Sequence, residues 1–172
     1  MNKKIIIYQV LPRLYGNKVA NPVPYGSIER NGCGKFVDFT SARLKKIRDL
    51  GVTHVWFTGI LEHATTTDYT AYGIKKDCES IVKGNAGSPY AVKDYYDVDP
   101  DLAVNVPQRM EEFEALLART HRAGMKVVID FVPNHVARTY NSDAAPKGVE
   151  DFGASDDKTQ SFNPDNNFYY IP

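Results

Sequence analysis

The residues best suited to chemistry lie in one short segment. Asp130 stands near the end of the apolar run 126–132, and Asn134 and His135 follow it closely. A carboxylate in a buried strand costs on the order of several kcal/mol unless it is paired or hydrogen-bonded, so Asp130 requires a partner. Ligands bind at the carboxyl ends of parallel strands in α/β folds, which favours a ligand site here. The alternative is that Asp130 only braces nearby backbone and His135 is a hydrogen-bonded loop histidine.

Apolar runs predict the strands that would position these side chains. Three runs are rich in β-branched residues, and each ends at a turn signal or a polar loop; they are Lys4 to Leu11, Val52 to Thr58 and Lys126 to Val132. Each is nearly continuous in apolar character, which is typical of strands buried on both faces. We therefore expect a parallel sheet built from these runs.

Two amphipathic segments predict the helices between the strands. Thr40 or Ser41 is a suitable N-cap for a first helix that Gly51 would end. Asn105 and Gln108 have the spacing of a capping box for a second helix, which Gly124 would end. Strands that alternate with helices of this length predict βαβ units and an α/β fold class.

Composition and charge exclude several classes of protein. The 172 residues are 42% hydrophobic, which is enough to build a core, and 21 basic residues balance 21 acidic ones. This balance argues against nucleic acid and anionic membranes as partners. The apolar run after Lys3 and Lys4 is too short for a signal peptide, so a cytoplasmic location is expected if Met1 is the natural start. Cys33 and Cys78 could pair or stay reduced, and their spacing offers no metal site.

Long connections separate the predicted elements. Residues 16–34 and 59–99 are rich in turn-forming residues and are expected to be loops. Loops of this length inside a compact domain are usually functional. The polar, irregular stretch after His135 runs to the aromatic group at Phe168 to Tyr170, for which packing is favoured over lining a sugar groove.

The order and spacing of three segments resemble the α-amylase family of retaining glycoside hydrolases. Asp-Phe-Val-Pro-Asn-His at 130–135 is similar to the family's Asp-x-x-x-Asn-His after the third strand, and residues 89–100 are similar to its Gly-Tyr-x-x-x-Asp-Tyr stretch. Ile7 to Val10 matches its first strand. The resemblance implies the first three βα units of a TIM (β/α)₈ barrel over residues 1–136. Residues 137–172 would begin the domain inserted after strand three, leaving an incomplete barrel.

The resemblance also implies roles for four residues. His135 would donate a hydrogen bond to the sugar beside the scissile bond, and Tyr90 would stack on that sugar. Asp130 would support the site by holding an arginine from a later strand. Asn134 would be a side-chain oxygen ligand for the calcium ion found in many members, and Asp143, Asp151 and Asp156 are nearby in sequence. The alternative for Tyr90 is packing within its loop, and His121, on the second helix, is expected to be structural.

Two positions depart from the family pattern. Pro89 stands where glycine usually precedes the tyrosine, and Gly59 stands where proline commonly ends the second strand. Both would lie at the mouth of the cleft, so they put the substrate range in doubt more than the family membership.

The catalytic carboxylates of such an enzyme are expected outside this chain. A retaining glycosidase needs two carboxyl groups roughly 5–5.5 Å apart, and the resemblance implies that they follow strands beyond the third. No catalytic residue is therefore predicted here. The function expected is the N-terminal portion of an enzyme that hydrolyses or transfers α-glucosidic linkages by double displacement, with an α-glucan or oligosaccharide as partner. The alternatives are a carbohydrate-binding module without catalysis and a structural fragment, and the isolated chain is expected to self-associate.

Overall fold

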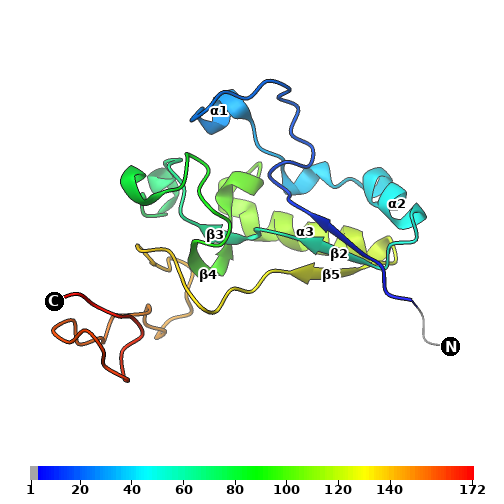
Figure 1. Ribbon diagram of the computed structural model, residues 1–172. Helices are drawn as coiled ribbons and strands as arrows, with labels where there is room; N and C mark the ends of the chain where they lie inside the picture. The colour runs from blue at the N-terminus through cyan, green and yellow to red at the C-terminus, as the bar shows by residue number, and fades with distance from the viewer. Residues whose placement is uncertain (1–3) are drawn as a thin grey trace.

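A three-stranded parallel sheet forms the centre of the molecule. The computed structural model describes residues 4–172, so residues 1–3 of the predicted first domain lie outside the described part. The strands are β1 (Ile7–Val10), β2 (His54–Phe57) and β5 (Lys126–Ile129), in the order β1-β2-β5 (Figure 1). Val10, Phe57 and Ile129 lie in register, so the carboxyl ends of all three strands meet at one edge. The predicted parallel sheet is confirmed.

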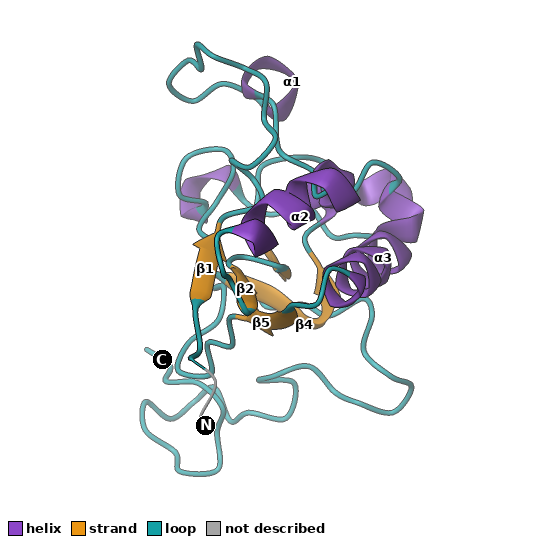
Figure 2. Cartoon of the chain, turned by 90° about the vertical axis from the view of Figure 1, so that its right-hand side faces the viewer, coloured by secondary structure: helices purple, strands orange, loops and turns teal. Residues whose placement is uncertain are grey.

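Both long helices cover the same face of this sheet (Figure 2). They are α2 (Ser41–Asp49) and α3 (Arg109–Arg122). The Thr40 hydroxyl accepts a hydrogen bond from the Arg43 amide at 3.3 Å, which confirms the predicted N-cap. Leu44 of α2 and Leu116 of α3 are fully buried against Val55 and Phe57 of β2, so these apolar contacts form the core.

The opposite face of the sheet is partly open, and the prediction of strands buried on both faces is wrong for the outer two. On this face Ile7 of β1 is 54% exposed and Val128 of β5 is 36% exposed, whereas His54 and Trp56 of the central strand are half-buried. Side chains alternate between the faces of a strand. Those that point away from α2 and α3 therefore have no covering layer within the described residues.

A β-hairpin occupies part of the connection that was predicted to be a loop. It consists of β3 (Leu61–His63) and β4 (Val92–Val98), which pair antiparallel with an irregular register. Charged residues inside these strands interrupt the apolar pattern, so no apolar run predicted them. The remaining elements are the short helix α1 (Ile28–Asn31) and five 3₁₀ turns, η1 (Phe36–Asp38), η2 (Thr70–Tyr72), η3 (Glu79–Ile81), η4 (Pro100–Leu102) and η5 (Val106–Gln108).

The second helix begins later than its sequence predicted. Asn105 does not cap the helix; its side-chain amide donates to the Gln108 side-chain oxygen at 2.8 Å. The Glu112 carboxylate from the first turn of α3 instead accepts the Asn105 amide at 2.7 Å and the Val104 amide at 3.0 Å. The intervening residues Val106–Gln108 form a 3₁₀ turn, and α3 begins at Arg109.

Residues 130–172 contain no helix or strand, and their first part is attached to β4 (Figure 1, yellow to red). The Ala137 amide donates to the Val92 carbonyl at 2.7 Å, and the Asn141 amide donates to the Lys93 carbonyl at 3.1 Å. The division into domains at 136/137 stays a prediction. Within residues 4–172, no helix is both long enough and apolar enough to cross a bilayer.

The two cysteines are free thiols in different surroundings, and they are expected to react at different rates. Burial raises the pKa of Cys33 to about 11, whereas a hydrogen bond with Ser80 lowers the pKa of the exposed Cys78. At pH 8 only on the order of one Cys33 in a thousand is a thiolate, the form that attacks iodoacetamide. Peptide mass spectrometry of an alkylation time course should show Cys78 modified far sooner. Equal rates in the native protein would contradict this, and urea should abolish the difference.

Candidate functional site

Asp130 is held at the carboxyl edge of the sheet by donors from the neighbouring strand and the loop that follows it. It comes directly after β5, where Trp56 of β2 donates its indole N–H to Oδ1. The Gly59 amide, just beyond β2, donates to Oδ2 at 3.2 Å. The predicted need for a partner is therefore confirmed. Each carboxylate oxygen accepts one hydrogen bond, which fits a residue that braces the strand ends rather than one that attacks a substrate.

Gly59 and Pro89, the two departures from the family pattern, are in contact with each other. Gly59 has a φ of +73°, a left-handed conformation that glycine adopts without strain. A Cβ atom at this position would lie 2.7 Å from the Pro89 Cβ atom. The missing side chain at 59 thus makes room for the proline ring at 89, and a proline at 59 would have no N–H to donate to Asp130.

Asn134 and His135 are exposed on the loop after β5 and bind each other. The His135 Nδ1 atom lies 2.8 Å from the Asn134 side-chain oxygen. Because an amide oxygen only accepts, the hydrogen of this bond sits on Nδ1. The neutral ring then presents Nε2 as an acceptor for a sugar hydroxyl, and the doubly protonated ring presents it as a donor. The predicted donor role of His135 therefore requires the charged ring in this arrangement.

A hollow of about 750 Å³ lies beside this loop. Its size falls within the range of small-ligand sites, roughly 300–1,000 Å³. His135 and Asn134 line it together with Tyr95, Phe131, Tyr140 and Phe152. Tyr90 is not among its lining residues; its side chain is 41% exposed and its amide donates to the Ser88 hydroxyl at 3.3 Å. The structure thus brings Asn134 and His135 to one hollow and leaves stacking by Tyr90 a prediction.

Tyr95 of β4 organises the aromatic wall of the hollow, and sequence analysis gave it no role. Its hydroxyl donates to the Val132 carbonyl and, at 3.4 Å, to the His135 carbonyl. Its ring centroid lies 5.7 Å from Phe131, 5.9 Å from Tyr140 and 6.1 Å from Phe152. Burial raises the pKa of Tyr95, so it acts as a neutral donor. Tyr95 is the last tyrosine of the Gly-Tyr-x-x-x-Asp-Tyr stretch, so the motif contained it but did not indicate its contacts.

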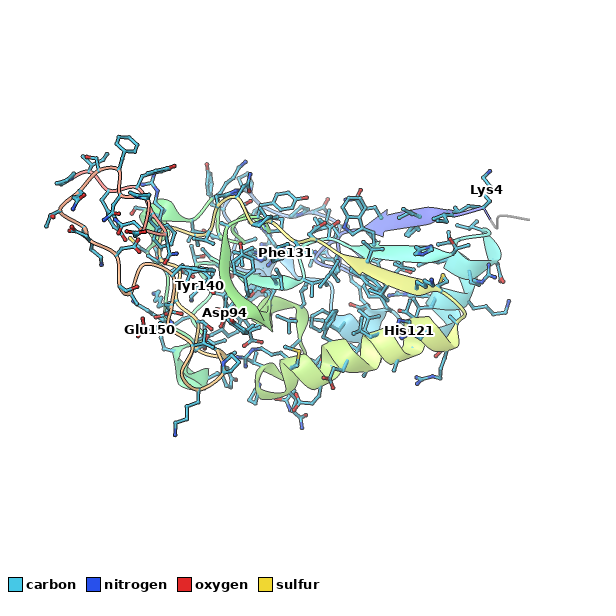
Figure 3. All side chains as sticks on the ribbon, turned by 90° about the horizontal axis from the view of Figure 1, so that it is seen from below. Lys4, Asp94, His121, Phe131, Tyr140 and Glu150 are labelled. Carbon is cyan, nitrogen blue, oxygen red and sulfur yellow. The ribbon has the colours of Figure 1, made fainter. Side chains whose placement is uncertain are left out.

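The arrangement of labelled side chains agrees with this placement (Figure 3). Phe131 follows β5, and Tyr140 lies on the C-terminal segment beside the strand that carries Asp94. His121 is on α3, three residues before Gly124 and at the end of the helix that leads into the start of β5. It therefore lies at the opposite end of the sheet from Asp130, as expected for a structural residue.

A buried ion-pair network connects the loop after β1 to the turn after β4. The Arg13 guanidinium donates to the carboxylates of Asp101 and, at 3.4 Å, Asp99, which are at most 1% exposed. The Tyr69 hydroxyl donates to the second oxygen of Asp101 at 2.6 Å, and His63 Nδ1 lies 3.5 Å from Asp99. Burial disfavours the charged guanidinium, but the two carboxylates raise the pKa of Arg13 above its ordinary value. Arg13 is therefore the cation that balances this buried negative charge.

A family model and similar proteins identify the family of this chain. A family model described as the catalytic domain of alpha amylase matches residues 27–169. Maltase 1 of Drosophila virilis is 26% identical over 151 residues, covering 86% of this chain and 18% of the maltase. Trehalose-6-phosphate hydrolase of Bacillus subtilis (strain 168) is 24% identical over 135 residues, covering 78% of this chain and 18% of the hydrolase.

A solved structure gives the same result for the fold. An alpha-amylase from Lactobacillus plantarum superposes with a TM-score of 0.52 and 30% identity, over 78% of this chain and 24% of the amylase. The α/β fold class and the incomplete barrel are confirmed, because the parallel strands form an open sheet within the described residues. The chain spans about 18% of the length of the maltase. Since the family model covers most of its residues, the chain belongs to the alpha-amylase family and corresponds to part of its catalytic domain.

Proposed function

We propose that this chain supplies the first strands and one wall of the sugar site of an enzyme that acts on α-glucosidic linkages. The observation that carries the proposal is the position of Asp130, Asn134 and His135 at the carboxyl edge of a parallel sheet, with the last two lining a hollow of about 750 Å³. Aromatic side chains on the same hollow suit the C–H face of a pyranose ring. The maltase and trehalose-6-phosphate hydrolase relatives support this substrate class by their names.

The proposed reaction is a retaining double displacement in which this chain binds and orients the sugar. One carboxylate would attack the anomeric carbon, while a second protonates the leaving oxygen and later activates water. These groups are expected on strands that follow the third in the family barrel. His135 would hold the sugar hydroxyls next to the scissile bond, and Asp130 would keep the strand ends in place through Trp56 and Gly59.

Calcium at Asn134 stays a prediction and takes no part in the proposed steps. In this structure the Asn134 oxygen faces the His135 ring. Two of the carboxylates near it in sequence accept local hydrogen bonds, Asp151 from the Ser142 amide and Asp156 from the Asn167 and Phe168 amides.

Substitution of His135 tests the proposal in the complete product of the gene that encodes this sequence. His135→Ala is expected to lower kcat/KM on maltooligosaccharides by about 10²-fold, the usual cost of losing one polar contact to the reacting sugar. Tyr90→Ala should raise KM, whereas Tyr90→Phe, which keeps the ring, should resemble the unsubstituted protein. Product anomers followed by NMR should show retained configuration.

His121→Ala is the matched control, because this histidine lies at the other end of the sheet and its loss should leave kcat/KM unchanged. Absence of any activity of the unsubstituted protein on α-glucosides would reject the enzyme class. If activity is present and His135→Ala leaves it intact, the class stands and the assignment of His135 fails.

A further inference from the structure

Three carboxylates from distant parts of the chain converge beside the β3–β4 hairpin. Glu62 lies in β3, Asp94 in β4 and Asp143 in the C-terminal segment, and one oxygen of each lies within 4.8 Å of the others. Glu62 is 1% exposed and Asp94 is fully buried, whereas Asp143 is exposed. The group is therefore buried on the protein side and open to solvent through Asp143.

Glu62 is a buried acid without a hydrogen-bond partner. Neither of its carboxylate oxygens has such a partner anywhere in residues 4–172. The Lys93 ammonium lies 3.6 Å from Glu62, but it is closer to Asp77, at 3.3 Å, and donates to the Lys75 carbonyl. Burial, and next the charge of Asp143, raise the pKa of Glu62 to about 8. A buried carboxylate whose oxygens accept no hydrogen bond destabilises the fold unless a cation other than Lys93 binds it.

The other two acids are held in place by backbone rather than by cations. Asp94 accepts the Tyr96 amide at 2.7 Å on one oxygen, and the Asp143 and Ala144 amides at 3.1 and 3.2 Å on the other. The C-terminal segment thus wraps around Asp94 and presents Asp143 to Glu62. The nearby Arg109 donates twice to a single oxygen of Asp97, so its charge is already paired.

We propose that Glu62, Asp94 and Asp143 bind a divalent cation, with Ca²⁺ as the first choice. An all-oxygen set selects a hard cation such as Ca²⁺, Mg²⁺ or Mn²⁺ over zinc. Two Ca–O bonds of about 2.3–2.6 Å can bridge oxygens separated by up to the observed 4.8 Å. The exposed Asp143 gives the ion a route in, and water molecules would complete its coordination.

The bound ion would fasten the C-terminal segment to the hairpin. Asp143 follows Tyr140, whose ring packs 5.9 Å from Tyr95 in the wall of the hollow. A cation on Asp143 would therefore help to order the side of that wall formed by Tyr140. Cation binding by these carboxylates does not depend on glycosidase activity.

Calorimetric titration of the metal-free complete gene product with Ca²⁺, Mg²⁺ and Mn²⁺ tests the proposal. We expect saturable binding of Ca²⁺ and a rise in Tm with Ca²⁺ concentration, because a ligand that binds only the folded state stabilises it. Glu62→Gln and Asp143→Asn should each weaken binding at least about tenfold. Asp165→Asn, which removes an exposed acid from the same segment, should change nothing.

A second signature separates cation binding from a simple ion pair with Lys93. Without metal, Glu62→Gln should unfold at a temperature no lower than the unsubstituted protein, because it removes a buried acid whose oxygens have no hydrogen-bond partner. A lower Tm without metal, together with unchanged Ca²⁺ affinity, would assign Glu62 to Lys93 and overturn the proposal. Absence of saturable binding of all three cations would overturn it as well. Should Glu62→Gln fail to fold, the exposed Asp143→Asn variant carries the same test.

Discussion

Replacement of Arg13 by alanine is expected to lower the free energy of unfolding by about 3–5 kcal/mol. Removing one partner of a buried ion pair leaves an uncompensated charge, and here two carboxylates, Asp99 and Asp101, would lose their guanidinium. Tyr69 would still donate to Asp101, but a phenol carries no positive charge. The loop after β1 would also lose its connection to the turn after β4.

Urea unfolding of the complete gene product, followed by far-UV circular dichroism, measures this loss. Lys45→Ala is the control, because Lys45 pairs with Asp49 at 2.7 Å on the surface of α2, where both side chains are more than half exposed. Exposed pairs of this spacing contribute about 0.3–0.5 kcal/mol. An Arg13→Ala variant no less stable than Lys45→Ala would show that Asp99 and Asp101 are neutral or solvated in the folded state.

Replacement of Gly59 by proline, the residue common in the family at this position, is expected to cost about 3 kcal/mol or more. Proline fixes φ near −65°, whereas Gly59 has a φ of +73°. The variant would also lose the N–H that Gly59 donates to Asp130 at 3.2 Å, and its ring would meet Pro89. Activity of the complete gene product should fall with stability, since Asp130 would lose one of its two donors.

Alanine variants separate two costs of a side chain at residue 59, the left-handed backbone conformation and the steric clash with Pro89. Gly73→Ala meets no atom within 4 Å, so it should cost only the left-handed penalty of about 1 kcal/mol. Gly59→Ala should cost more, because its Cβ atom would approach Pro89, and Pro89→Gly should recover that excess in the double variant. Additive effects of the two substitutions would disprove the contact. A Gly59→Pro variant as stable as the unsubstituted protein would show that the backbone at residues 58–60 can adopt the conformation that proline requires.

The central elements were predictable because local pattern and tertiary environment agree there. Val55 and Phe57 are apolar, β-branched or aromatic, and fully buried, so an apolar run was sufficient to locate β2. Thr40 was predictable as the cap of α2 because its hydroxyl accepts from the Arg43 amide, only three residues later in the sequence. The hairpin escaped detection because Glu62 and Asp94, charged residues within its strands, are buried by contacts with segments far away in sequence.

The site was predictable only in part, for a similar reason. Asp130 was conspicuous as a charge in an apolar run, and its need for a partner followed from the burial expected of that run, although Asp130 itself is only half-buried. The identity of its partners, Trp56 and Gly59, depends on strand pairing across more than 70 residues, which no local pattern contains. Tyr90 was located by its motif, but the loop path that leaves it outside the hollow of His135 is set by contacts that the motif does not specify.

The open sheet has a consequence for the order in which such a barrel is built during translation. Within residues 4–172, β1 and β5 each pair with β2 and leave their other edge free. In a closed eight-stranded barrel every strand has two neighbours, so the second neighbour of β1 is the eighth strand. A family member therefore emerges from the ribosome with its first strand half-paired and completes that strand only when its last one appears. Closure is a contact of maximal sequence separation, which is the kind that forms slowly.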